Sequence, residues 1–367
     1  MISVSPRENC FQAWRRETKV KRSMGKIIWT VIVVGWALGI MFSAIQAAPQ
    51  TYPEAELSNG ILNARIPLPD AHLGYYRGTR FDWSGMIVSL NYKGHNYFAP
   101  FYDKFEPALP DIEVRDKVAA GANSAASGPV EEFISPGETA LGYSDAKPGE
   151  GFCKIGVGVL QKPQEPNYSS FQNYKILNPG TWTIRKGGDW IEFVQKLNCG
   201  SRYSYEYRKT IRLVKNKPEM TLEHSITNTG GKTIETIVYD HNFLVMDRQT
   251  TGPDFVVTFP FAPKATATLD GFAELRGNQL VFVKTLKNDD VLYTPLEGFG
   301  GSARDYKISV ENRKTGAGVI ITGDQPLTKV VFWSIRTVLA PEAFLSMKIE
   351  PGKTHKWTYR YQFYTVP

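Results

Sequence analysis

The sequence predicts an all-β fold of packed antiparallel sheets, because strand patterns follow one another without alternating helices. One observation is the stretch TWTIRKGGDWIEFVQKL, in which two alternating runs meet at Gly187–Gly188, a pattern typical of a β-hairpin. A second is the segment 203–245, which holds three strand patterns separated at Asn216–Pro218 and Gly230–Gly231. A third is the series of later strand patterns: LVFVK, KISVENR, GVIITG, KVVFWSI and HKWTYRYQFYTV.

Residues 1–47 have the pattern of a leader that contains a secretory signal peptide. The apolar segment Ile27–Ile45 follows a basic stretch and precedes small residues, and translation starts at Met1 or at Met24. We expect cleavage after Ala47, which predicts a periplasmic or secreted protein. The alternative is an uncleaved anchor in the inner membrane, because about 20 apolar residues can span a bilayer. The membrane is therefore a partner only if the leader is retained.

Most of the net charge of +7 lies in this leader, since residues 1–26 carry seven basic and two acidic side chains. The remaining chain is close to neutral, so we expect no nucleic-acid partner.

Cys10 lies in the leader, whereas Cys153 and Cys199 either pair in an oxidising compartment or remain free buried thiols. The chain has no Cys-x-x-Cys motif or Cys/His cluster, so we expect no structural metal site.

The strand patterns after the leader predict a single domain over residues 48–367. Glycine and proline are scattered along this part of the chain and do not gather in one linker. The segment Lys117–Pro129 is small and polar, which predicts an exposed loop within the domain.

His241 is the histidine best placed for chemistry. It follows the predicted strand Thr233–Tyr239 and has Asp240 and Phe243 beside it. A histidine at a strand end can exchange a proton with a ligand near neutral pH. The alternative is a hydrogen-bonded histidine packed in a β corner. We expect His224, in mid-strand, to be structural.

Glu342 is the best candidate for a general base. It lies between Pro341 and Ala343 in an otherwise apolar run, so we expect it to be partly buried and suited to accepting a proton. The alternative is a strand-end carboxylate paired with an arginine such as Arg336.

A third candidate region is the run HLGYYRGTRFDWSGMIVSL. Aromatic rings stack on the apolar faces of sugars, while arginine and aspartate hydrogen-bond to sugar hydroxyls. The alternative is a twisted strand with a charged edge. The residues that crowd together here are Tyr75, Tyr76, Arg77, Arg80, Phe81, Asp82 and Trp83.

The stretch from Tyr205 to Leu244 resembles the aldose 1-epimerase, or galactose mutarotase-like, superfamily. The segments YRKTIRLVKNKPEM, TLEHSITNTGGKTIET and YDHNFL follow the order and spacing of that family, and KIEPGKTHKWTYRYQF resembles its closing strand. The resemblance spans most of residues 57–364. It implies a supersandwich of antiparallel sheets that binds a sugar in a concave cleft.

The resemblance also implies roles for the candidate residues. By position, Glu342 would take the proton from the anomeric hydroxyl and His241 would protonate the ring oxygen, without a metal or an organic cofactor. The comparable region, EGFCKIGVGVL, lacks the family's earlier histidine, and Lys154 within it or Glu132 before it is the candidate replacement. The residues expected to bind the sugar are Arg77, Arg80, Asp82, Trp83 and Asn242.

Three classes of function remain open. The first is an exported aldose 1-epimerase-like isomerase whose partner is a mono- or oligosaccharide. The second is a non-catalytic saccharide-binding protein or an accessory to polysaccharide degradation. The third is a lyase or hydrolase on the same fold, for which two carboxylates among Asp82, Asp240 and Glu342 would be needed. The site assignment requires His241 and Glu342 to converge, with Arg77 or Arg80 beside them.

Overall fold

A computed structural model describes residues 52–102, 125–165, 167–200 and 203–366. The chain divides into Met1–Gln50 and Thr51–Pro367, and all described residues belong to the second part. The predicted leader therefore lies outside the described residues. In the described part no helix is long and apolar enough to cross a membrane. Its regular elements are strands and two short 3-10 helices, Met246–Arg248 and Ala303–Asp305.

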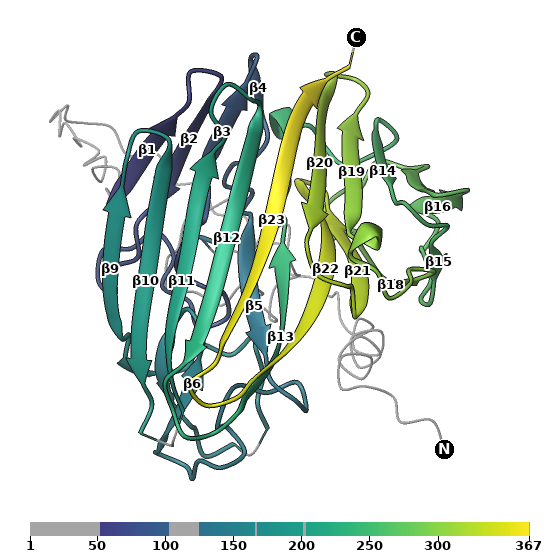
Figure 1. The fold of residues 1–367 in the computed structure, drawn as a ribbon. Helices are drawn as coiled ribbons and strands as arrows, with labels where there is room; N and C mark the ends of the chain where they lie inside the picture. Colours follow the sequence, from purple (N-terminus) through teal and green to yellow (C-terminus); the bar gives the residue numbers. More distant parts are fainter. Residues whose placement is uncertain (1–51, 103–124, 166, 201–202, 367) are drawn as a thin grey trace, which may run out of the picture. The chain divides into compact units, whose positions relative to one another are not determined.

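The larger of the two main sheets has ten antiparallel strands (Figure 1). In spatial order these are β16 (Ala273–Arg276), β17 (Gln279–Phe282), β14 (Phe255–Thr258), β19 (Lys307–Asn312), β20 (Ala317–Gly323), β23 (Thr354–Thr365), β12 (Glu219–Asn228), β11 (Ser204–Leu213), β10 (Trp190–Asn198) and β9 (Thr181–Lys186).

The second main sheet has six strands, and two smaller sheets accompany it. The six strands are β15 (Lys264–Ala265), β18 (Val291–Glu297), β21 (Lys329–Ile335), β22 (Val338–Ile349), β13 (Ile234–His241) and β5 (Val130–Ile134). The smaller sheets are formed by β1 (Glu54–Ser58), β2 (Leu62–Pro67), β3 (Ser89–Tyr92) and β4 (His95–Asn96), and by β6 (Gly151–Lys154), β7 (Gly158–Gln161) and β8 (Ile176–Asn178).

The predicted strands are confirmed where the alternation of apolar and polar residues is clearest. The hairpin around Gly187–Gly188 joins β9 to β10, and β11, β12 and β13 are separated at the two predicted breaks. In β11 every second side chain is buried, as expected for a strand with one face in the core. The all-β prediction is therefore confirmed.

The main core lies between the ten-stranded and the six-stranded sheet. It combines residues such as Tyr207 and Trp357 from the first sheet with Val238 and Leu345 from the second. Because side chains alternate along a strand, the other face of the six-stranded sheet presents a different set of residues. That second face carries a small cluster around Tyr239, Val331 and Phe344.

Two local expectations are wrong. The described end of the predicted exposed loop, residues 125–129, is buried, and the Ser127 hydroxyl donates to the Ile87 carbonyl at 2.7 Å. Small side chains allow this backbone to pass through the interior, and residues 117–124 lie outside the described part. Residues 72–88 form no strand, so the twisted-strand alternative is also wrong. They form a loop region that is mostly buried from Gly74 on, and glycines interrupt any alternation in it.

Cys153 in β6 and Cys199, just beyond β10, form a disulfide with their Cα atoms 5.9 Å apart. Both residues are buried. Of the two alternatives for these cysteines, the structure adopts the paired one. The bridge connects the small β6–β7–β8 sheet to the edge region of the ten-stranded sheet.

Candidate functional site

The register of β13 with its two neighbours explains how the candidate residues meet. Tyr239 of β13 lies opposite Phe344 of β22 and opposite Glu132 of β5. Two residues further along, His241 reaches Glu342, and the alternation of side chains places this pair on the same face as Tyr239. Figure 1 shows β13 between β5 and β22.

His241 and Glu342 are in direct contact. The His241 Nε2 atom lies 3.1 Å from Glu342 Oε1, and the two side chains are only 4% and 7% exposed. The expected convergence of the two residues is therefore present, while their catalytic roles stay predictions. Glu342 lies inside β22 and not at its end, which the alternative of a strand-end carboxylate had assumed.

Aromatic rings surround the His241 imidazole. The Phe243 ring stacks on it with a centroid distance of 3.6 Å, and Trp333 and Phe81 meet it edge-on at 5.2 and 5.8 Å. Phe243 adopts a positive φ of 38°, which side chains with a Cβ rarely adopt. The backbone after β13 is therefore held in an unusual conformation that places this ring against the imidazole.

Arg80 is the predicted arginine that reaches this face of the sheet. Its Nε donates to Glu132 Oε2 at 2.8 Å and its Nη2 donates to the Tyr239 hydroxyl at 3.0 Å. Its guanidinium carbon lies 4.4 Å from the centre of the Phe81 ring and 4.5 Å from that of Phe171. Two hydrogen bonds and two ring contacts therefore fix the guanidinium in one orientation.

Of the two candidates for the place of the family's earlier histidine, Glu132 contacts Arg80 and Lys154 contacts Glu132. Glu132 is fully buried and accepts a hydrogen bond of 2.5 Å from Tyr239. The Lys154 Nζ lies 3.6 Å from the other oxygen of Glu132 and donates to the Phe133 carbonyl at 2.7 Å. The site thus has a second, charged half next to the His241–Glu342 pair.

Arg77 and Trp83 have local partners. Arg77 donates to the carbonyls of His72 and Gly74 at 2.7 and 3.4 Å, so it stabilises the conformation of its own loop. The Trp83 indole is 3% exposed and donates to the Gly78 carbonyl at 2.8 Å.

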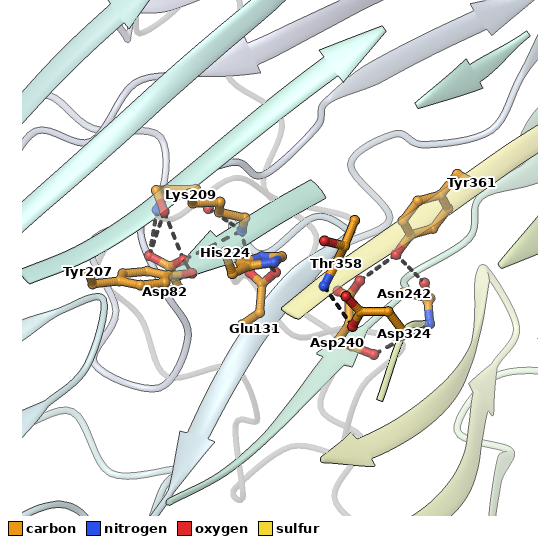
Figure 2. Close-up of polar contacts among 11 residues, drawn as sticks. Asp82, Glu131, Tyr207, Lys209, His224, Asp240, Asn242, Asp324, Thr358 and Tyr361 are labelled. Carbon is orange, nitrogen blue, oxygen red and sulfur yellow. Dashed lines mark hydrogen bonds and ion pairs between the residues drawn. The ribbon is translucent and has the colours of Figure 1, made fainter. Parts of the chain in front are cut away.

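Asp82 lies on the core side of the six-stranded sheet, together with Glu131. The Tyr207 hydroxyl donates to Asp82 at 3.0 Å, and Lys209 Nζ lies 3.5 Å from it (Figure 2). Burial raises the pKa of Asp82. Burial also opposes ionisation of Glu131, but Lys209 and His224 outweigh it and lower the pKa of Glu131 to about 2. The structural role predicted for His224 agrees with this placement.

Asn242 and Asp240 meet at a tyrosine in the same core. The Tyr361 hydroxyl contacts Asp240 and donates to Asn242 Oδ1 at 2.8 Å (Figure 2). Asn242 Nδ2 donates to the Pro341 carbonyl at 2.5 Å. Burial, reinforced by the Glu131 charge, raises the pKa of Asp240 to about 8. Asn242 therefore fixes the turn after His241 through its own contacts.

The structure also adds residues that the sequence analysis had not named as part of the site. Tyr239 could have been found, because it is two residues before His241 on the same strand and so shares its face. Trp333 and Phe171 have no such local signal. In the described residues, no group of three or more His, Cys, Asp or Glu side chains is arranged to hold a metal ion.

Comparison with known proteins places the fold. No protein-family model and no curated protein sequence matches the chain. Among solved structures, the Slr1438 protein from Synechocystis sp. PCC 6803 superposes with a TM-score of 0.51 at 11% identity, over 87% of this chain and 98% of that one. A galactose mutarotase-like protein from Clostridium acetobutylicum gives a TM-score of 0.50 at 11% identity, over 85% and 95% of the two chains.

The chain has the galactose mutarotase-like fold. The predicted supersandwich of antiparallel sheets is therefore confirmed. At this identity the likeness concerns the fold alone, and the chemistry has to be argued from this chain's own residues. In this chain the residues that could carry chemistry are His241, Glu342 and the Arg80 cluster beside them.

Proposed function

We propose that this protein binds a mono- or oligosaccharide and interconverts the anomers of an aldose, as an aldose 1-epimerase-like isomerase. The contact between His241 and Glu342 carries the proposal. Opening a sugar ring needs one group that removes a proton and another that supplies one, both close to the anomeric carbon. The galactose mutarotase-like fold supports a sugar as the class of ligand.

Glu342 and His241 together would supply every proton transfer that the reaction needs, without a further reagent. The Glu342 carboxylate accepts the proton of the anomeric hydroxyl, whose oxygen becomes a carbonyl as the bond from the anomeric carbon to the ring oxygen breaks. The His241 imidazolium donates its proton to that ring oxygen. Rotation of the aldehyde presents its other face, and ring closure reverses both proton transfers. The opposite anomer leaves, and both residues have returned to their starting states.

The resting contact supports these roles. A protonated His241 and an ionised Glu342 attract each other in a site of low exposure, and these are the forms in which the reaction begins. The two sugar oxygens are bonded to the same carbon, so the pair needs to separate only modestly to admit them. The Trp333 ring, which is half-buried and meets the His241 imidazole edge-on, is the aromatic group that could pack against a sugar face.

A non-catalytic saccharide-binding protein is the second candidate. The His241–Glu342 contact is also compatible with this second candidate, because the two side chains bind each other and are almost completely buried. In that case the pair would hold the sheet together, and the sugar would meet Arg80 and the neighbouring aromatic rings without chemical change. The two candidates differ in whether the protein accelerates anomer exchange.

Substitution of Glu342 by glutamine separates the two candidates. Glu342→Gln keeps the shape but removes the base, so we expect the anomerisation rate measured by polarimetry to fall by about 10²–10⁴-fold. Sugar affinity measured by calorimetry should stay nearly unchanged. His241→Asn should have the same effect. Glu235→Gln, the same substitution at an exposed position on β13, the strand of His241, is the matched control and should keep the rate. A rate that survives Glu342→Gln would contradict the assigned role.

We also propose that the protein is exported. The basic and apolar pattern of residues 1–47 supports this, and so does the Cys153–Cys199 disulfide, since such bonds persist in oxidising compartments. N-terminal sequencing of the protein from its native host should begin at Ala48 or within a few residues of it. A cytosolic protein that begins at Met1 would overturn the proposal, and a membrane-bound protein that retains Ile27–Ile45 would support the anchored alternative.

A further inference from the structure

A lysine is completely buried between two carboxylates in the main core, away from the His241–Glu342 face. Lys209 lies on the inward face of β11. Its Nζ contacts Glu131 of β5 directly, lies 3.5 Å from Asp82 Oδ2 and donates to the Ser84 carbonyl at 2.8 Å. Figure 2 shows Lys209, Asp82 and Glu131 pointing toward one another from three separate segments of the chain.

The Asp82 carboxyl group is polarised by several hydrogen-bond donors. The Ser84 backbone N–H donates to Oδ1 at 2.9 Å, and the Ser84 hydroxyl lies 2.9 and 2.8 Å from the two oxygens. The Tyr207 hydroxyl donates to Oδ2 at 3.0 Å. Donors fixed around a carboxyl oxygen stabilise the negative charge that develops there when a nucleophile attacks its carbon.

Glu131 is placed to accept protons from Lys209. His224 Nε2 lies 2.6 Å from its other oxygen, which holds the carboxylate in orientation. The lowered pKa of Glu131 keeps it ionised, and the raised pKa of Asp82 favours the neutral carboxyl form that an amine can attack. Burial lowers the pKa of Lys209, but Glu131 and Asp82 outweigh it and raise this pKa, so the transfer of the lysine proton to Glu131, whose own pKa is lowered, is the energetically unfavourable first step.

Tight packing excludes water from this cluster. Asp82, Glu131 and Lys209 are each 0% exposed. At Gly156 an added Cβ would lie 2.6 Å from Asp82 Oδ1, and at Gly85 it would lie 2.9 Å from Lys209 Nζ. Both glycines also have a positive φ. A dry, fixed arrangement of amine and carboxyl raises their effective concentration strongly and protects an amide from hydrolysis.

We propose that Lys209 and Asp82 condense to an intramolecular amide cross-link, with Glu131 as the proton acceptor. Lys209 passes a proton to Glu131, and the free amine attacks Cγ of the protonated Asp82 carboxyl. The nitrogen–carbon bond forms, the carbon–hydroxyl bond breaks, and the hydroxyl leaves as water with a proton returned by Glu131. The nitrogen, which still carries two protons after the attack, then passes one of them to Glu131 and keeps the other as the amide proton. The cluster is electrically neutral before and after, and no oxidant or other reagent is required.

The cross-link would replace the buried Lys209–Glu131 ion pair by a neutral amide and a protonated Glu131. This change removes the cost of keeping two charges out of water. It would also tie the loop segment 72–88, which carries Arg80, to β11 across 127 residues of sequence. This modification does not depend on the proposed isomerase activity.

Intact-mass spectrometry of the purified, reduced and denatured full chain tests the proposal. We expect a mass lower by one water than the mass calculated from the determined N-terminus. Proteolytic mapping should yield one branched peptide that joins the Asp82 and Lys209 segments, with no tryptic cleavage after Lys209. The full calculated mass in the wild-type protein would overturn the proposal, as would a cross-link that maps to Glu131.

Three variants sharpen the assignment. Asp82→Asn should lose ammonia in place of water and give the same cross-linked mass as the wild type, because the product is identical. Lys209→Arg keeps the charge but should retain its full mass. Glu131→Gln removes the proton acceptor and should lower the cross-linked fraction by about tenfold or more. An Asp82→Asn protein that cross-links to a different final mass would contradict the proposal, and the wild-type mass decides it even if a variant does not fold.

Discussion

Neighbouring residues in the two central strands have different environments because the pleat turns successive side chains to opposite faces. On β13, Tyr239 and His241 face the candidate site, while Asp240 between them faces the core. On β5, Glu132 binds Arg80 on the site face and Glu131 contacts Lys209 on the core face. Acids adjacent in sequence are therefore separated by the sheet.

The pH dependence of stability tests the environment of Asp240. Its pKa is raised to about 8 by burial, whereas in the unfolded chain it is about 3.9. Between these values only the folded state holds the proton, so this group lowers stability as pH rises, by up to about 1.4 kcal/mol per pH unit. Its favourable contribution is complete below about pH 3.9 and is lost by about pH 8.

Asp240→Asn removes this titration while Asn can still accept from Tyr361. In urea unfolding, we expect the stability of the wild type relative to this variant to fall between about pH 5 and pH 8 and then to level off. Asp270→Asn, in an exposed turn, is the control and should show no such trend. A difference that stays constant across this range would show that Asp240 is not protonated in the folded protein.

Single candidate residues were predictable where their immediate sequence neighbours distinguish them. His241 stood out because it ends a strand among aromatic residues, and Glu342 because an acid interrupts an apolar run. Pattern could not separate Arg80 from Arg77, since only the folded loop decides which guanidinium reaches Glu132. It also could not foresee Lys209 between two acids, because those acids are 127 and 78 residues away in sequence.

At the scale of elements, β13 is the strand that builds the site. Its pairing with β22 ends at Tyr239 and Phe344, and two residues beyond that pair His241 contacts Glu342. Its pairing with β5 places Tyr239 opposite Glu132. The strand itself was predictable from its alternation and from the glycines before it. Its two partners were not, because β5 and β22 are distant in sequence and their register depends on long-range packing.

The disulfide is the covalent link between elements near the site. It closes a loop of 46 residues and fixes β6, which carries Lys154 next to Cys153, to the end of β10. For a loop of this length, we expect reduction to lower the free energy of unfolding by about 3–4 kcal/mol. Denaturant unfolding with and without a reducing agent measures this difference. The double variant Cys153→Ala with Cys199→Ala should be insensitive to the reducing agent, and equal midpoints for oxidised and reduced wild type would contradict the expectation.

At the scale of the whole molecule, the fold class was predictable because turns and alternation are local signals that recur along the chain. The order of strands in the two main sheets was not predictable from local pattern, since partners such as β12 and β23 are far apart in sequence. The buried loop segments also escaped prediction. Residues 74–88 and 125–129 have no alternating pattern, and most of them are buried only because the folded chain packs around them.

The proposed activity requires His241 and Glu342 to act as the proton-transfer pair of a sugar isomerase. Polarimetry of freshly dissolved hexoses, pentoses and uronic acids, with and without the wild-type protein, measures this activity. We expect the protein to accelerate the approach to anomeric equilibrium for at least one aldose and to leave the equilibrium rotation unchanged. An uncatalysed rate across the whole panel would contradict the isomerase assignment and leave saccharide binding as the function of the site.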